Sequence, residues 1–169
     1  MNNFRIIKTA EIKDNPFKLI ARDWMLITAG NKESFNCMTA SWGMMGHIWN
    51  KDVALVVIRP TRFTYQFTEK NEYFTICIFD KQYRDVLNVC GTKSGRDFDK
   101  IKATGLIPLE TKLGSIYYKQ ARLVMECRKL YVDDLKEGNF LDSSIIKMYP
   151  EKDYHRMYVG EIIQAFEKI

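Results

Sequence analysis

The architecture of this chain is clearest in residues 53–65, which read Val53-Ala54-Leu55-Val56-Val57-Ile58-Arg59-Pro60-Thr61-Arg62-Phe63-Thr64-Tyr65. The first six residues are a continuous apolar run of strand length, which predicts a strand covered on both faces. The run stops at Arg59-Pro60, and Thr61 is placed to cap a helix over residues 62–70 that Asn71 closes. A buried strand is therefore expected to lead directly into a helix.

The same junction predicts an anion site. The first amides of a helix lack intrahelical partners, and the helix dipole adds partial positive charge there. Arg59 and Arg62 contribute paired N–H donors that match the geometry of phosphate oxygens. Two arginines on a solvated turn are the alternative interpretation of these residues.

Outward from this junction, short extended segments alternate with short helices. Asn15-Pro16 predicts an N-cap followed by proline at the first helical position. Two further helices are expected over residues 83–89, ended by Gly91, and 97–104, capped by Asp97 and ended by Gly105. Strands are expected over residues 24–29, 35–42, 53–58, 73–79, 123–132 and 156–166.

This order of elements favours a mainly β fold with helices at the ends of a closed or nearly closed sheet. A βαβ repeat and a Gly-x-Gly-x-x-Gly motif are both missing from the sequence, which argues against a doubly wound dinucleotide fold. The chain has 169 residues, of which 46% are hydrophobic, and it contains no internal repeat or linker. We therefore expect one domain spanning residues 1–169.

Charge and cysteine content narrow the functional classes. The net charge of +5 predicts a mild positive potential, which suits a phosphate-bearing ligand and does not require nucleic acid. Four separated cysteines without a Cys-x-x-Cys pair and only two histidines give no metal site. No signal peptide and no apolar window of about 20 residues is visible, so we expect a cytoplasmic protein with no membrane association.

Two more segments carry polar groups that suit a cofactor. Residues 36–43 place the hydroxyls of Thr39 and Ser41 beside the indole of Trp42, a surface that can bind the edge of a flat heteroaromatic ring. Residues 90–100 form a polar loop with two glycines, whose backbone amides can line a ligand. An ordinary solvent-facing strand and a plain surface loop are the respective alternatives.

Four segments together resemble the flavin reductase-like family of FMN-binding split barrels, in particular its flavoredoxin-like branch. They are Asn15-Pro16 with Trp24-Met25-Leu26-Ile27-Thr28-Ala29-Gly30, Met38-Thr39-Ala40-Ser41-Trp42-Gly43, Arg59-Pro60-Thr61-Arg62-Phe63-Thr64, and Ser94-Gly95-Arg96-Asp97-Phe98-Asp99-Lys100. Their order and spacing extend over most of the chain.

The resemblance implies a six-stranded antiparallel split β-barrel with short flanking helices, usually a homodimer, with non-covalent FMN near the subunit interface. The flavin itself would carry the redox chemistry, so no catalytic side chain is assigned. Three groups of residues are implied in cofactor binding: Met38, Thr39, Ala40, Ser41 and Trp42 along the isoalloxazine ring; Arg59, Thr61, Arg62 and Thr64 at the phosphate and ribityl chain; and Ser94, Gly95, Arg96 and Lys100 on the remaining side.

Two activities fit such a site. One is an FMN-dependent flavin reductase that uses NADH or NADPH as electron donor, which we favour. The other is a flavoredoxin-like electron carrier that serves a redox protein partner. A basic domain that binds nucleic acid is a remote third alternative, because the basic residues are scattered among 21 acidic ones and no nucleic-acid-binding motif is present.

Overall fold

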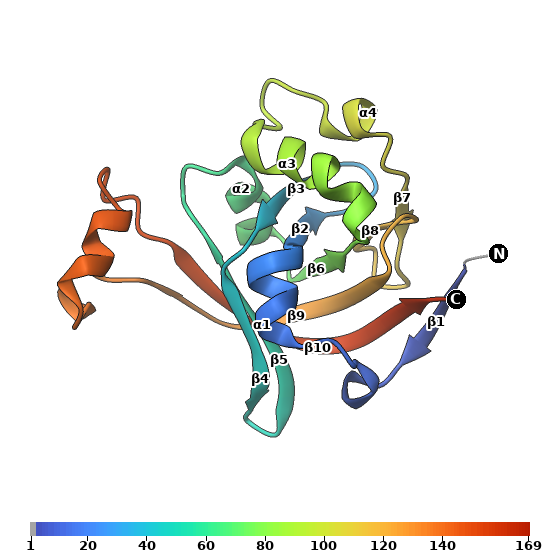
Figure 1. The fold of residues 1–169 in the computed structure, drawn as a ribbon, viewed down its shortest axis with the longest axis horizontal. Helices are drawn as coiled ribbons and strands as arrows, with labels where there is room; N and C mark the ends of the chain where they lie inside the picture. Colours follow the sequence, from blue (N-terminus) through green and yellow to red (C-terminus); the bar gives the residue numbers. More distant parts are fainter. Residues whose placement is uncertain (1–2) are drawn as a thin grey trace.

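A computed structural model describes residues 3–169 and has one eight-stranded antiparallel sheet as its body (Figure 1). The strand order is β3-β2-β6-β9-β10-β5-β4, with β1 paired to β10 outside this path, and β7 and β8 form a small second sheet. The strands are β1 (Phe4–Ile7), β2 (Met25–Gly30), β3 (Phe35–Ala40), β4 (Gly43–Ile48), β5 (Lys51–Ile58), β6 (Tyr73–Ile78), β7 (Pro108–Glu110), β8 (Ile116–Tyr118), β9 (Leu123–Asp134) and β10 (Arg156–Lys168).

The connection between β3 and β4 shows that the sheet curls back on itself. These strands stand at opposite ends of the pairing order, yet only Ser41 and Trp42 separate them in the chain. The two ends of the sheet must therefore meet at this turn. The expected mainly β, antiparallel split-barrel fold with short helices is confirmed, and the sheet is longer than the six expected strands because β1 and β4 extend it.

The central strands are buried on both faces. In β2, Leu26 belongs to the apolar cluster under helix α3 (Arg84–Thr92), whereas its neighbour Ile27 belongs to the cluster enclosed by the curled sheet. Val124 and Met125 of β9 divide in the same way, because successive side chains of a strand point to opposite faces. This double burial explains why these strands are continuously apolar.

Helices α2, α3 and α4 lie together on the side of β2 and β3, and α1 lies in front of the long strands (Figure 1). Helices α2 and α3 pack against β3, and α2 also contacts β2 (Figure 1). Asn15 caps α1 as expected, since its Oδ1 accepts hydrogen bonds from the amides of Phe17 and Lys18. The helices are α1 (Pro16–Lys18), which continues as a wider turn over Leu19–Asp23, α2 (Phe63–Lys70), α3 (Arg84–Thr92) and α4 (Lys100–Thr104).

Several predicted boundaries are wrong. The N-cap of α2 is Arg62 without a side-chain cap, so Thr61 does not cap it. Helix α4 begins later than expected, because Asp99 and not Asp97 accepts the hydrogen bond from the Lys102 amide. Helix α3 continues through Gly91 to Thr92, whereas Gly105 ends α4 in the left-handed conformation as predicted.

Strand β4 and its tight hairpin with β5 were not predicted. Trp49 and Asn50 form the turn between them, both with positive φ near 54°. A two-residue turn of this kind ordinarily carries Asn-Gly or Asp-Gly, so the pair Trp-Asn gives a weak signal. The predicted strand over residues 35–42 therefore ends at Ala40 and is followed by a separate strand.

Residues 135–155, which we call the arm, leave the sheet between β9 and β10 and protrude from the body (Figure 1, orange). Short 3-10 turns cover Glu137–Asn139 and Ser143–Met148. The arm has its own small aromatic cluster, in which Tyr149 packs on Phe140 and Tyr154 with ring centroids 5.9 and 5.0 Å apart.

No helix within residues 3–169 is long and apolar enough to span a bilayer.

Candidate functional site

The first cleft of interest lies along the end of β3. It has a volume of about 210 Å³ and is called the strand-edge cleft here. Its walls come from the β3–β4 turn, the end of β5 and the start of β10, which the antiparallel pairing brings together. The lining residues are Met38, Thr39, Ala40, Ser41, Trp42, Val57, Arg59, Arg62 and His155.

A second cleft of about 190 Å³ lies between the start of α2 and the loop after α3, and we call it the loop cleft. Arg62 lines both clefts, so the three segments singled out in the sequence meet around this one guanidinium. The remaining lining residues of the loop cleft are Thr61, Phe63, Thr64, Thr92, Lys93, Ser94, Gly95, Arg96 and Lys100.

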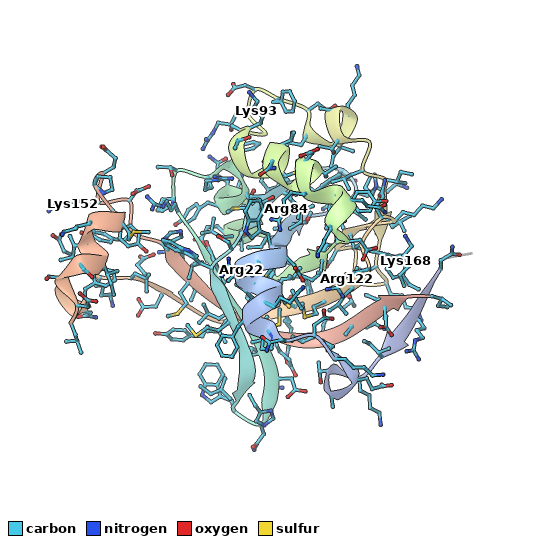
Figure 2. All side chains as sticks on the ribbon, viewed as in Figure 1. Arg22, Arg84, Lys93, Arg122, Lys152 and Lys168 are labelled. Carbon is cyan, nitrogen blue, oxygen red and sulfur yellow. The ribbon has the colours of Figure 1, made fainter. Side chains whose placement is uncertain are left out.

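The loop cleft is rich in positive charge that no acid balances. Four of its lining residues are Arg62, Lys93, Arg96 and Lys100, and none is Asp or Glu. Figure 2 shows Lys93 beside the C-terminal end of α3. Because no side chain caps α2, the backbone amides at its start add further donors on the same wall. This combination is suited to an anion such as a phosphate group.

Arg62 is the central cation of this arrangement. Its guanidinium donates one hydrogen bond, over 2.7 Å, to the backbone carbonyl of Gly91, and it forms no ion pair with an acid of the described chain. Burial lowers the pKa of Arg62, and the nearby charge of Arg59 lowers it further. A partly buried guanidinium with one neutral partner has the free donors and unbalanced charge that an anionic ligand would satisfy.

The buried side chain of Lys100 connects the two elements that form the walls of the loop cleft. Its side chain is buried, and Nζ donates to the carbonyl oxygens of Cys37 on β3 and Cys90 on α3, at 2.7 and 3.0 Å. Burial lowers the pKa of Lys100. This ammonium therefore ties strand to helix and contributes charge beneath the cleft, while Arg96 at the rim donates to Thr61 O over 3.2 Å.

Gly95 is needed for close packing of the loop. A Cβ atom at this position would come within 2.1 Å of Asn36 Oδ1 and 3.2 Å of the Phe63 ring. Asn36 cannot move freely, because it is buried and its Nδ2 donates to Thr64 Oγ1 over 2.7 Å. Asn36 was not among the predicted site residues, yet it connects β3, the start of α2 and the loop.

Arg59, which was expected to bind the phosphate, is paired with the arm. Its guanidinium forms a bidentate ion pair with Asp153, at 2.7 and 2.8 Å, and donates to Met148 O over 2.8 Å. It also lies 4.9 Å from the centre of the Tyr149 ring. The charge of Arg59 is thus already balanced by the arm, and the predicted phosphate ligand that remains available is Arg62.

The side-chain hydroxyl of Thr39 also has a partner within the chain. It donates to the carbonyl of Leu87 in α3 over 2.6 Å, which fixes the end of β3 against that helix. The buried Thr64 likewise accepts from Asn36 as described above. These two threonines hold the walls in place, whereas Ser41 and Trp42 are the more accessible polar and aromatic groups of the strand-edge cleft.

His155 is a site residue that the sequence did not single out. It is 8% exposed, lines the strand-edge cleft and packs against Trp42 with ring centroids 5.2 Å apart. A hydrogen bond of 2.8 Å joins its Nδ1 to the Tyr149 hydroxyl. Burial, followed by the charge of Arg59, lowers the pKa of His155 to about 4, so the ring is neutral at pH 7.

The position of His155 follows from the pairing of β10 with β5. Arg156 pairs with Ile58 across β10 and β5, so His155 follows directly from the antiparallel register as the neighbour of Arg59. Finding it requires the pairing of the closing strand with residues 53–58, which the sequence alone did not provide. The two strands are separated by about half of the chain.

A third cleft is the largest of those near the site, with a volume of about 670 Å³. It lies on the other side of the 95–100 loop, and we call it the outer cleft. Glu33, Asp97 and Asp99 are among its lining residues, together with Cys37 and Lys100. Acids line the outer cleft beside Arg96 and Lys100, whereas none lines the loop cleft, so the smaller loop cleft is the better anion site. Within residues 3–169, no group of three or more His, Cys, Asp or Glu side chains is arranged to hold a metal ion.

Comparison with known proteins extends this picture. A family model described as the flavin reductase like domain matches residues 17–168. No curated protein matches the chain in sequence.

Solved structures show the same fold. A flavoredoxin from Methanosarcina acetivorans has 22% identity and a TM-score of 0.65, covering 85% of this chain and 67% of that one. An FMN-binding protein from Thermus thermophilus has 21% identity and a TM-score of 0.67, covering 86% and 71%. An NADH:FAD oxidoreductase from Streptomyces globisporus has 14% identity and a TM-score of 0.63, covering 85% and 73%.

Proposed function

The chain belongs to the flavin reductase-like domain family, and we propose that it is an oxidoreductase that binds FMN without a covalent bond across the two clefts that meet at Arg62. The observation that carries this proposal is the convergence itself. A strand edge with an exposed indole and a cleft with unbalanced cations share one guanidinium, which matches a ligand that is aromatic at one end and anionic at the other.

Each wall would have a distinct role. Arg62, with Arg96, Lys93 and the amides at the start of α2, would bind the phosphate. Ser41 and Trp42 would lie along the isoalloxazine ring, with the neutral His155 behind the indole. Gly95 and Asn36 would keep the loop close enough to the strand for both ends of the ligand to be held.

The bound flavin would supply the redox chemistry, since it can exchange a hydride or single electrons. The residues of the chain bind and orient it, and those of the strand-edge cleft shape the space through which a donor approaches. Trp42, at 41% exposure, leaves this side accessible. We propose that the donor is NADH or NADPH, in keeping with the fold shared with an NADH:FAD oxidoreductase.

A flavoredoxin-like electron carrier is the second candidate, favoured by the fold shared with a flavoredoxin. Steady-state oxidation of NADH and NADPH with added FMN separates the two. A reductase should show sustained turnover that depends on FMN. A carrier should show negligible turnover, while its bound flavin is still reduced by a chemical reductant and reoxidised by a protein acceptor.

We also propose that two copies associate through the arm. Leu141 is fully exposed, and Ile145 and Met148 are 40% and 49% exposed on the same protrusion, away from the core of their own chain. Such apolar groups suit a surface that a second copy covers. Light scattering after size exclusion should give a dimer mass, and Leu141→Asp with Ile145→Asp should shift it to the monomer.

The proposal for FMN is tested by titration. Purified chain should quench the fluorescence of added FMN to a saturating end point and should show flavin absorbance after gel filtration. A colourless protein with no change in FMN fluorescence would contradict it.

A further inference from the structure

Two buried cysteines lie together where α3 packs on β3. Cys37 on β3 and Cys90 on α3 have their Sγ atoms 3.9 Å apart, and their exposed fractions are 1% and 0%. They are distant in sequence and approach each other because α3 packs on β3. Lys100 bridges the same two residues through their backbone carbonyls.

The two thiols are chemically unequal. The hydrogen bond with Cys90 is the main cause that lowers the pKa of Cys37 to about 7, and Tyr118 and the charge of Lys100 act in the same direction against the effect of burial. The same hydrogen bond and burial raise the pKa of Cys90. Cys37 is thus the more acidic thiol of the pair, which suits it to the role of the attacking cysteine with Cys90 as the resolving one.

The remaining cysteines are different. Cys77 is fully buried, and burial raises its pKa to about 12. Cys127 is also fully buried, with its pKa raised by burial, and its Sγ lies near the carbonyl of Met125. Among the clefts described above, the outer cleft is lined by Cys37 and by no other cysteine, so it is the side from which a small molecule would approach the pair.

We propose that Cys37 and Cys90 form a dithiol centre that a hydroperoxide oxidises reversibly to a disulfide. The Sγ atoms must approach from 3.9 Å to the S–S bond length of about 2.05 Å, which requires side-chain rotation and a shift of α3 toward β3. Because Cys37 is so little exposed, the oxidant has to be small.

The reaction balances with hydrogen peroxide as the oxidant. The Cys37 thiolate attacks one peroxide oxygen, so that an S–O bond forms, the O–O bond breaks and the leaving hydroxide takes a proton from solvent. Cys90 then attacks the Cys37 sulfur, so that the S–S bond forms, the S–O bond breaks and a second water leaves with the Cys90 proton. The dithiol loses two electrons, and the peroxide is reduced to two waters.

Oxidation would act on the walls of the loop cleft. Lys100 Nζ donates hydrogen bonds to the backbone carbonyls of Cys37 and Cys90. Arg62 donates a hydrogen bond to the carbonyl of Gly91, the residue after Cys90. Closing the S–S bond draws β3 and α3 together at the level of these cations. The centre does not itself need a bound flavin, so its test is independent of the function proposed above.

The test uses the full chain, reduced and then treated with hydrogen peroxide. After quenching, free thiols are alkylated in denaturant without reductant. The intact mass should be lower by two hydrogen atoms, and only two of the four cysteines should carry the alkyl group. A peptide map should show Cys37 joined to Cys90 by a disulfide. Dithiothreitol should restore four alkylated thiols. Four free thiols after oxidation, or a crosslink through Cys77, would overturn the proposal.

Matched alanine variants identify the attacking thiol. Cys90→Ala should accumulate a sulfenic acid at Cys37, trapped by dimedone, because no resolving thiol remains. Cys37→Ala should give neither the dimedone adduct nor the disulfide, and the control Cys127→Ala should form the disulfide like the parent chain. Dimedone on Cys90 in the Cys37→Ala chain would contradict the assigned roles. If a variant does not fold, the peptide map of the parent chain remains decisive.

Discussion

The strand-edge cleft and the loop cleft meet at Arg62 but differ in whether their positive charges have acidic partners. In the first, Arg59 is neutralised by two hydrogen bonds to Asp153, and His155 is kept neutral by burial. In the second, Arg62 and its three cationic neighbours face no acid. Two arginines separated by two residues in sequence thus have different partners, and only the unbalanced one is free to select an anion.

The largest effect should come from adding a charge to the balanced cleft. Protonating His155 places a cation beside Arg59. The pKa of His155 is about 4 in the folded chain and about 6.5 in the unfolded chain. Between these pH values the unfolded chain binds more protons, so the free energy of unfolding falls as the pH falls. The loss should reach about 3 kcal/mol by pH 4.

Denaturant melts between pH 7 and pH 4 measure this loss. His155→Gln should flatten the pH dependence relative to the parent chain. An identical slope for the parent chain and His155→Gln would remove His155 from the explanation.

Next in size is the effect of Arg62 on ligand binding. A charge-assisted hydrogen bond contributes about 1.5–3 kcal/mol, so Arg62→Ala should weaken FMN binding by about 10- to 100-fold. Riboflavin, which lacks the phosphate, should be affected much less. Fluorescence titration with both flavins measures the difference, and equal losses for the two would show that Arg62 does not bind the phosphate.

Arg59 provides the matched comparison for that experiment. Arg59→Ala should change the FMN affinity by a smaller factor than Arg62→Ala, because its guanidinium is already paired with Asp153. A larger loss from Arg59→Ala than from Arg62→Ala would reverse the distinction between the two clefts.

A smaller effect is expected from Gly95. The Cβ of Gly95→Ala would displace the Asn36 amide and break its hydrogen bond to Thr64, with an expected cost of about 1–2 kcal/mol in stability. Thermal unfolding measures it. Gly138→Ala is the control, since nothing lies within 4 Å of a Cβ at that position.

The smallest global effect should follow from Asp153→Asn. The pair with Arg59 is partly exposed, with side-chain exposures of 26% and 14%, so its loss should cost roughly 1 kcal/mol or less. The local effect should be clearer, because Arg59 also anchors Met148 O and Tyr149. Hydrogen exchange within residues 135–155 should accelerate while exchange in β2 stays unchanged.

The sequence predicted the elements that local patterns specify. Apolar runs and alternation identified β2, β5, β6, β9 and β10, and Asn15-Pro16 identified the start of α1. The strands β1, β7 and β8 are only three or four residues long, too short for a periodic pattern. The arm has no sequence pattern of its own, since its cluster consists of aromatic residues brought together by short turns.

What the sequence determined by itself was the kind of group present at each segment: a buried strand ending in arginines, a strand edge with hydroxyls and an indole, and a loop with glycines. The convergence of these segments follows from that order once the sheet curls. Which arginine stays unpaired, which histidine is buried and which cysteines touch were decided only by the tertiary structure. The physical reason is that burial and charge pairing depend on partners far away in the chain, such as Asp153 for Arg59 and Cys90 for Cys37.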